Sequence, residues 1–499
     1  MADSTGGTAA GAAPAEQHTV AETELKAGAI GLPGVLMIGV TAIAPAIAGM
    51  FTIPFIVSNA GVAAPLAYLG AFAIALMLGY VLAQFSKYMT SAGTYYTFVS
   101  RSLGGRMGFL VAWIYLLFYP VVVAQVGSFM GDTLQSTLKA EYNVTFKWWW
   151  FMIFLIVLVA VTAYRGIEIS TGIVIVLGIL ETLIVLALAI SGFADAGPGG
   201  VNFHWINPGN APSGHAFVLG IVFAIFAISG WDCAAPTAEE SEDPKRNIPR
   251  GVLGSIVILG IFLFIVSWGQ TAGWGTKDMP GFAGSSELPA FVLGHKVWGG
   301  AWIIVLIALF NSAIAVAIAT TNAATRFIYG MARTGVLPRQ LTKVHPRYKT
   351  PVTAIGFQTV VNIGLGLILP IGVGVANVYN ITGTWFTFAL APVYAAANVG
   401  LYLYVRKHHP GSFNWFKHAL VPLVGTVALG FVVYYSLNPL PAWPIKLAPL
   451  VVVLWLALGV VMLATMIVSG KESLLARAGD AVMERIETPE EHAARPEFI

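Results

Sequence analysis

Two acidic residues, Glu181 and Asp232, lie inside long apolar segments of the sequence. If such a segment crosses a membrane, an ionised carboxylate near its middle costs at least about 2.5 kcal/mol. Each acid must therefore be protonated, be solvated in a cavity, or meet a cation that comes from outside. We expect a site for a proton, a metal cation or an amine. The alternative is structural: Glu181 is a protonated hydrogen-bond donor, and Asp232 bonds to exposed backbone N–H groups.

Two of the apolar segments are interrupted near their middle, by TAIAPAIAG at 41–49 and by AISGWDCAAP at 227–236. Where a helix unwinds, its N–H and C=O groups lose their partners and can bind ions or substrate. We therefore predict that a substrate binds at the two breaks under Phe226 as an apolar lid, with Glu181 as the coupling candidate. The predicted substrate-binding residues are Ala44, Pro45, Ala46, Ile47, Ala48, Gly49, Phe226, Ser229, Gly230, Trp231 and Asp232.

Other polar residues in apolar segments are weaker candidates. They are Tyr115, Tyr119 and Asn311, together with Thr320 and Thr321, whose hydroxyl oxygens could coordinate sodium. No catalytic residue, metal site or cofactor is expected, because HExxH, Walker and GxSxG patterns are missing from the sequence. The single cysteine, Cys233, excludes an intramolecular disulfide and a cysteine-based metal cluster.

These residues require membrane helices to position them. The chain is 57% hydrophobic and only 10% charged, whereas a soluble domain has about 25% charged residues. Such a chain cannot cover itself with polar surface, so the lipid bilayer is its expected solvent. The net charge of +3 is spread over short loops, which argues against nucleic acid as a partner.

Twelve apolar stretches are long enough to cross the hydrocarbon core as helices, which takes about 20 residues each. With the N-terminus inside, 21 of the 26 Lys and Arg residues fall on the cytoplasmic side, as the positive-inside rule requires. We predict an all-α, multi-pass protein of the cytoplasmic (plasma) membrane with both termini in the cytoplasm. The predicted spans are 33–57, 61–85, 107–131, 147–164, 169–192, 214–237, 251–274, 297–325, 352–372, 378–404, 419–437 and 446–468.

The two interrupted helices are the first and the sixth, so five helices separate one break from the other. Because five is odd, a repeat of helices 1–5 as helices 6–10 must insert upside down. We predict a disordered cytoplasmic N-terminal tail at 1–30, a transporter domain at 31–468 and a cytoplasmic C-terminal tail at 469–499. Within the domain, repeat 1 is 33–192, repeat 2 is 214–404, and helices 11 and 12 occupy 419–468.

Three motifs resemble the amino acid-polyamine-organocation (APC) superfamily. The stretch GWDCAAPTAEESEDPKRNIPRG at 230–251 is similar to the family pattern at helix 6, with Asp243 where members have Asn. SAGTYYTFVSRSLGGRMGFLVAW at 91–113 resembles the helix 2 to 3 segment, and ARTGVLPRQLTKVHPRYKTPV at 332–352 resembles the helix 8 to 9 loop. The resemblance covers about residues 30–470 and implies a LeuT-type five-plus-five inverted repeat, alternating access and substrate at the broken helices.

Two positions depart from the family pattern. The first break has one glycine and a proline, whereas many amino-acid members have a Gly-x-Gly segment that binds the substrate carboxylate. Glu181 stands where several sodium-independent members have a lysine that replaces the coupling ion. An acid at this position suits a proton or a cationic substrate.

The resulting expectation is a permease rather than an enzyme. It would carry amino acids, polyamines or related amines by symport with protons, or with sodium as the second choice. A substrate exchanger, a channel and a solute sensor with a transporter fold remain alternatives. The C-terminal tail of about 30 residues is too short for an output domain, which argues against the sensor.

Overall fold

The computed structural model describes residues 25–438, 440, 442–472 and 474–475. In these residues, twelve segments are helical, long and apolar enough to span a membrane, which confirms the predicted number. The predicted fold class is thus confirmed: the protein is all-helical with twelve membrane spans. The α-helices are α1 Leu32–Ile43, α2 Ile53–Ala60, α3 Ala64–Tyr88, α4 Tyr95–Leu103, α5 Gly105–Phe118, α6 Val122–Tyr142, α7 Trp148–Arg165, α8 Ile167–Ala194, α9 Gly214–Ile228, α10 Pro244–Trp274, α11 Met279–Ala283, α12 Pro289–Trp298, α13 Ile303–Arg333, α14 Val352–Ile363, α15 Leu369–Val373, α16 Val375–His408, α17 Val421–Leu437 and α18 Leu447–Val468.

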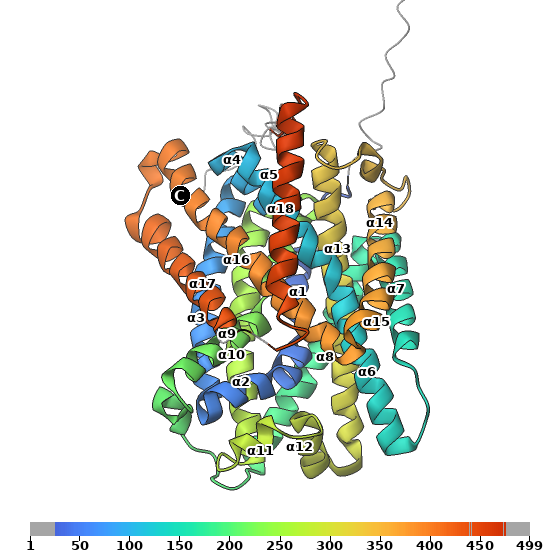
Figure 1. The fold of residues 1–499 in the computed structure, drawn as a ribbon, viewed down its shortest axis with the longest axis vertical. Coiled ribbons are helices and arrows are strands. Elements are labelled where there is room, and N and C mark those ends of the chain that lie inside the picture. Colours follow the sequence, from blue (N-terminus) through green and yellow to red (C-terminus); the bar gives the residue numbers. More distant parts are fainter. Residues whose placement is uncertain (1–24, 439, 441, 473, 476–499) are drawn as a thin grey trace, which may run out of the picture.

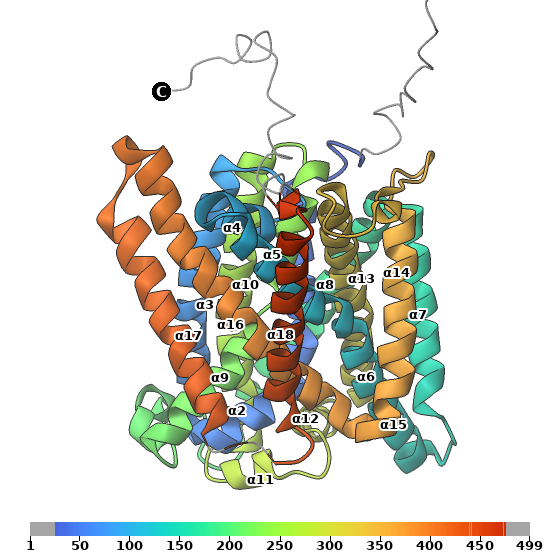
Figure 2. The same ribbon diagram turned by 45° about the horizontal axis from the view of Figure 1, so that its top comes forward.

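The long helices stand side by side, with α2, α11 and α12 across one end of the bundle and α4 at the other (Figure 1). The end where α3, α13 and α16 finish is called the basic end below. Its helix ends are tied together, since the Tyr96 hydroxyl bonds that of Thr334 at 2.9 Å and the Tyr88 and Tyr404 rings lie 5.9 Å apart. In the turned view of Figure 2, α17 lies at the periphery and α18 crosses the front of the bundle.

Burial separates the central helices from those that face lipid. In the most apolar window of each span, 83% of the residues are buried in the span at Leu32–Phe51 and 11% in Leu447–Val468. Helix α8 shows the same division between its faces: Val176 and Leu183 are exposed, whereas Val185 and Glu181 are buried. Because residues three or four apart share a helix face, the burial of Gly178 and Val185 places Glu181 on the inward face.

The first helix is interrupted where the sequence predicts. Helix α1 ends at Ile43, and Ala44 adopts a left-handed conformation with φ of 59°. After Pro45 the chain continues as a π-helical turn at Ile47–Phe51 and then as α2. Pro45 lacks an N–H and restricts the residue before it, which explains why the α-helix cannot pass this point.

The sixth helix is interrupted as well. Helix α9 ends at Ile228, Gly230 has φ of 131°, and a 3₁₀ helix follows at Trp231–Glu240. The 3₁₀ segment begins inside the predicted break at 227–236 and extends three residues beyond the predicted end of the span at 237. Pro236 lies within the 3₁₀ segment and removes a donor that an α-helix would need.

Two predictions need correction: the extent of the N-terminal tail and the position of Arg326. Residues 25–30 are ordered where a disordered tail is predicted, since Ile30 pairs with Ser241 in an isolated bridge and Leu25 is buried. Arg326 is fully buried inside α13, which continues to Arg333, whereas the predicted span 297–325 ends just before this residue. The remaining parts of the predicted tails, 1–24 and 476–499, lie outside the described residues.

Candidate functional site

The two breaks lie directly against each other. A Cβ atom on Gly230 would lie 2.4 Å from the carbonyl oxygen of Ala42, at the end of α1. No side chain fits at that distance, and the positive φ of Gly230 disfavours any residue with a Cβ atom. Close approach of the backbones, rather than flexibility, therefore requires glycine at this position.

A cavity of about 60 Å³ lies beside the two breaks. Its wall is formed by both broken helices together with α6, α13 and α16. It is mainly apolar, with seven hydroxyl, thiol or amide side chains. Its lining residues are Ala42, Ile43, Ala44, Ile47, Ala48, Thr52, Tyr119, Val122, Gln125, Val126, Phe226, Ala227, Ser229, Gly230, Cys233, Val316, Thr320, Tyr379 and Phe386. The cavity has room for only a few water molecules.

The cavity gathers about half of the predicted binding residues. Those that line it are Ala44, Ile47, Ala48, Phe226, Ser229 and Gly230. Those that do not line it are Pro45, Ala46, Gly49, Trp231 and Asp232. Gly49 faces α10 and α8 instead, since a Cβ atom there would lie 3.0 Å from Val266 and 3.4 Å from Val185. A large residue at Gly49 would thus disturb helix packing rather than fill the cavity.

Glu181 reaches the first break from α8. Its side chain is fully buried, and Oε2 accepts a hydrogen bond of 3.2 Å from the N–H of Ala46. Ser312 of α13 lies beside the carboxylate and accepts from the N–H of Ile47 at 3.4 Å. Oε1 is buried without a hydrogen-bond partner among the described residues. The acid is thus placed at the N-terminal end of the half-helix that follows the break, where the helix dipole favours negative charge.

Asp232 is buried at the start of the 3₁₀ segment and is surrounded by tyrosines. Oδ2 accepts a hydrogen bond of 2.6 Å from the hydroxyl of Tyr115. The Tyr115 hydroxyl also lies 3.3 Å from that of Tyr119, and the Tyr95 ring packs against Tyr115 and Tyr394 at centroid distances of 5.9 and 5.5 Å. This arrangement satisfies the carboxylate with neutral donors.

Some of the weaker candidates line the cavity, and others contribute to helix packing. Tyr119 and Thr320 line the cavity. Thr321, the residue after Thr320, is buried, and its hydroxyl has no hydrogen-bond partner among the described residues. Asn311 donates to the carbonyl of Leu177 at 2.6 Å and joins α13 to α8.

Two ion pairs connect the 3₁₀ segment to α13 at the basic end. Arg326 donates to both oxygens of Glu240 at 2.8 and 3.2 Å, with both side chains buried. Arg333 donates to both oxygens of Glu239 at 3.0 and 2.7 Å, and these side chains are partly exposed. The sequence signal was the adjacent Glu239 and Glu240 of the helix 6 motif, but their partners are about 90 residues away. The second break is thereby fixed to α13 on this side of the cavity.

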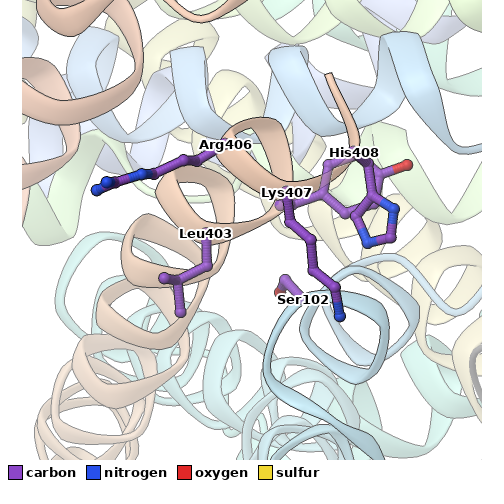
Figure 3. Close-up of a pocket in the computed structure, with 6 residues that line it drawn as sticks. Ser102, Leu403, Arg406, Lys407 and His408 are labelled. Carbon is purple, nitrogen blue, oxygen red and sulfur yellow. The ribbon is translucent and has the colours of Figure 1, made fainter. Parts of the chain in front are cut away.

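A second hollow, of about 270 Å³, lies on the surface at the basic end between α4 and the end of α16. Figure 3 shows Lys407 extending towards Ser102, with Arg406 pointing away from it. None of its lining residues belongs to either break, so it is separate from the site described above.

The fold and the paired breaks define a class of protein, a multi-pass membrane transporter with two interrupted helices. The sequence profile of the Amino acid permease family matches residues 30–468. The chain belongs to this family, and it is a transporter rather than an enzyme.

Several relatives support this assignment. The branched-chain amino acid permease BcaP of Bacillus subtilis is 28% identical, over 71% of this chain and 76% of the relative. The methylthioribose transporter of the same organism is 24% identical over 86% and 90%. The low-affinity putrescine importer PlaP of Escherichia coli is 23% identical over 73% and 79%. The named substrates of these relatives differ in charge and size, so the family alone leaves the substrate of this chain open.

Proposed function

We propose that the protein is a secondary transporter for amino acids or related amines, coupled to protons and working by alternating access at the two breaks. The observation that carries this proposal is the bond between Glu181 and the N–H of Ala46. It places a titratable group in direct contact with the broken helix that forms one wall of the cavity. Permeases of amino acids and of putrescine among the relatives support the substrate class.

Coupling follows from what a proton would change at Glu181. The ionised carboxylate favours the positive end of the half-helix after Pro45, and a proton weakens that attraction. Oε1 has room for the proton, because it has no partner among the described residues. Loading and release of a proton would then shift the position of the first break, and with it access to the cavity.

We assign the basic end to the cytoplasm, following the distribution of Lys and Arg. In the described state this end is held shut, since Glu239 and Glu240 pair with α13. Opening towards the cytoplasm requires the 3₁₀ segment to separate from α13. The pair Arg333–Glu239 is partly exposed, so water screens it.

The test is the substitution Glu181→Gln in proteoliposomes with an imposed pH gradient. The amide keeps the size and hydrogen-bonding capacity of the side chain but cannot titrate. We expect substrate binding and counterflow to persist while gradient-driven accumulation is lost. Glu168→Gln, on the exposed start of the same helix, is the matched control and should behave as the unmodified protein. Unchanged gradient dependence in Glu181→Gln would leave Glu181 with a structural role and remove proton coupling.

Sodium coupling is the second candidate, favoured by one observation. The hydroxyl of Thr321, next to the cavity residue Thr320, is buried without a partner among the described residues. Such an oxygen can coordinate a hard cation. Uptake that follows an imposed sodium gradient at constant pH, and that fails in Thr321→Val, would favour this candidate over the proton.

A further inference from the structure

The stretch at the first break, Ala44–Ala48, has used all of its main-chain donors. Its first and last N–H groups donate to carbonyl oxygens three and four residues earlier, at 3.0 and 2.8 Å. Pro45 has no N–H. The two N–H groups after the proline donate to Glu181 Oε2 and Ser312 Oγ, at 3.2 and 3.4 Å. This stretch therefore offers no free N–H group to a substrate carboxylate.

Three hydroxyl groups in the cavity wall also donate their hydrogen within the protein. The hydroxyls of Thr52, Ser229 and Thr320 each donate to the carbonyl four residues earlier in their own helices, at 2.6, 2.7 and 2.7 Å. The amide nitrogen of Gln125 uses one of its two hydrogens in a bond of 3.2 Å to the carbonyl of Tyr379. Each hydroxyl has one hydrogen but two lone pairs, so what remains for a ligand is acceptor capacity.

Electrostatics favour the same kind of ligand. The described lining of the cavity contains no Lys, Arg or His. Asp232 lies behind its wall, next to the lining residue Cys233, and Glu181 lies behind the first break. Tyr119 and Tyr115, which separate Asp232 from the cavity, direct hydroxyl groups towards that carboxylate. An anionic group entering the cavity would meet negative charge and few donors, whereas an ammonium group would meet acceptors and negative charge.

We propose that the solute recognised at the two breaks is an organic amine without a carboxylate group. This inference rests on the proposed function and narrows its substrate class. The ammonium group donates to the acceptors of the wall, and the apolar residues of the wall contact its hydrocarbon part. The position that a substrate carboxylate would need at the first break is already filled by Glu181, a carboxylate of the protein itself.

Matched compounds test this proposal on the purified, full-length protein in lipid nanodiscs. Leucine is compared with 3-methylbutylamine, which differs from it by loss of the carboxylate, and with leucinamide, which keeps its size but not its negative charge. Ornithine and 1,4-diaminobutane form a second pair. Titrations followed by thermal stabilisation give the apparent affinities. We expect each amine to bind at least about tenfold more tightly than its amino acid, because a buried carboxylate without donors is costly.

Leucinamide separates charge from size. It should bind more tightly than leucine if the negative charge is what the site rejects, and equal rejection of leucinamide and leucine would overturn the proposal. In Asp232→Asn the preference for amines should fall at least about threefold, whereas Glu168→Gln should leave it unchanged.

The remaining outcomes are also decisive. Amino acids that bind as tightly as their amines, or amines that fail to bind at millimolar concentration, would overturn this inference and leave the proposed transporter untouched. Amines that bind without entering proteoliposomes would instead count against the proposed function.

Discussion

At the scale of single residues, Arg326 is the most buried cation of the described chain. Its effect on the stability of the fold depends on Glu240. Both side chains are almost completely inaccessible, with exposed fractions of 0% and 1%. Asn322 and Thr325 bond the remaining face of the guanidinium at 3.3 and 3.2 Å. A buried pair of this kind stabilises little in itself, but the loss of one partner leaves the other charge uncompensated.

We therefore expect Arg326→Met to lower the free energy of unfolding by about 3–5 kcal/mol. The double variant Arg326→Met, Glu240→Leu should recover most of that loss, because no charge is left buried. Lys26→Met is the control, since the Lys26–Glu168 pair is half exposed and is worth at most about 1 kcal/mol. Thermal unfolding in detergent compares the three variants. If Arg326→Met is as stable as Lys26→Met, the pair has no structural role.

At the scale of the elements, the crossing of the two broken helices depends on Gly230. A Cβ atom there would lie 2.4 Å from the carbonyl oxygen of Ala42 and 3.0 Å from the nitrogen of Ile43. Both contacts are to backbone, so no rotation of a side chain can relieve them. The second break can approach the first only without a side chain at this position.

We expect Gly230→Ala to abolish uptake and to lower the unfolding temperature measurably. Gly172→Ala in α8 is the matched control, because nothing lies within 4 Å of the added Cβ atom. Alanine in the middle of a helix is favoured over glycine by about 0.5–1 kcal/mol, so the control should be neutral or slightly stabilising. Uptake by intact cells and thermal unfolding of the purified variants are the measurements. Normal transport by Gly230→Ala would show that the breaks can separate without loss of function.

The sequence predicted the elements far better than their contacts. Runs of apolar residues and the Pro and Gly at the breaks are local signals, and they predicted the twelve spans and the positions of both interruptions. The neighbours of Glu181 and the wall of the cavity could not be predicted this way. Ser312 and Gln125 are ordinary polar residues in apolar helices. Only the packing of α13 and α6 brings Ser312 to the first break and Gln125 to the cavity wall.

The burial of Arg326 is a second feature that the sequence could not predict. A lone cation resembles a helix-end residue in the sequence, so the predicted span stops at residue 325, although the segment FIYGMA follows Arg326. In the structure α13 continues to Arg333, and Glu240, on a distant segment, supplies the charge that compensates the buried Arg326. A pattern along one helix does not contain that information.

At the scale of the whole molecule, the orientation in the membrane is the main prediction that the fold leaves to experiment. We expect the loop from Arg333 to Thr350 and both termini to face the cytoplasm, as the excess of Lys and Arg requires. Cys233 is buried and would first be replaced by alanine. Single cysteines placed in that loop and in the tails should then react with an impermeant reagent only after the cells are permeabilised. Labelling in intact cells would show that the topology is the reverse of the predicted one.

The short segment before α1 limits how many parts of the molecule can move independently. The N–H groups of Ala29 and Ile30 donate to the carbonyl of Glu240 at 2.8 and 3.1 Å, and Glu242 returns a bond to Ile30 at 3.0 Å. The parts of the two broken helices nearest the basic end are therefore fastened together. We therefore expect these two segments to move as one rigid body rather than as two.

That reduction in degrees of freedom has a measurable consequence for transport. In a Cys233→Ala background, a bifunctional maleimide between Gly31→Cys and Glu242→Cys joins two parts that already move as one, since a Cβ atom on Gly31 would lie 3.1 Å from the Glu242 carboxylate. Uptake should be nearly unaffected. A bifunctional maleimide between Glu239→Cys and Arg333→Cys joins the moving unit to α13 and should stop uptake. The opposite result would mean that the two broken helices open separately, each as its own gate.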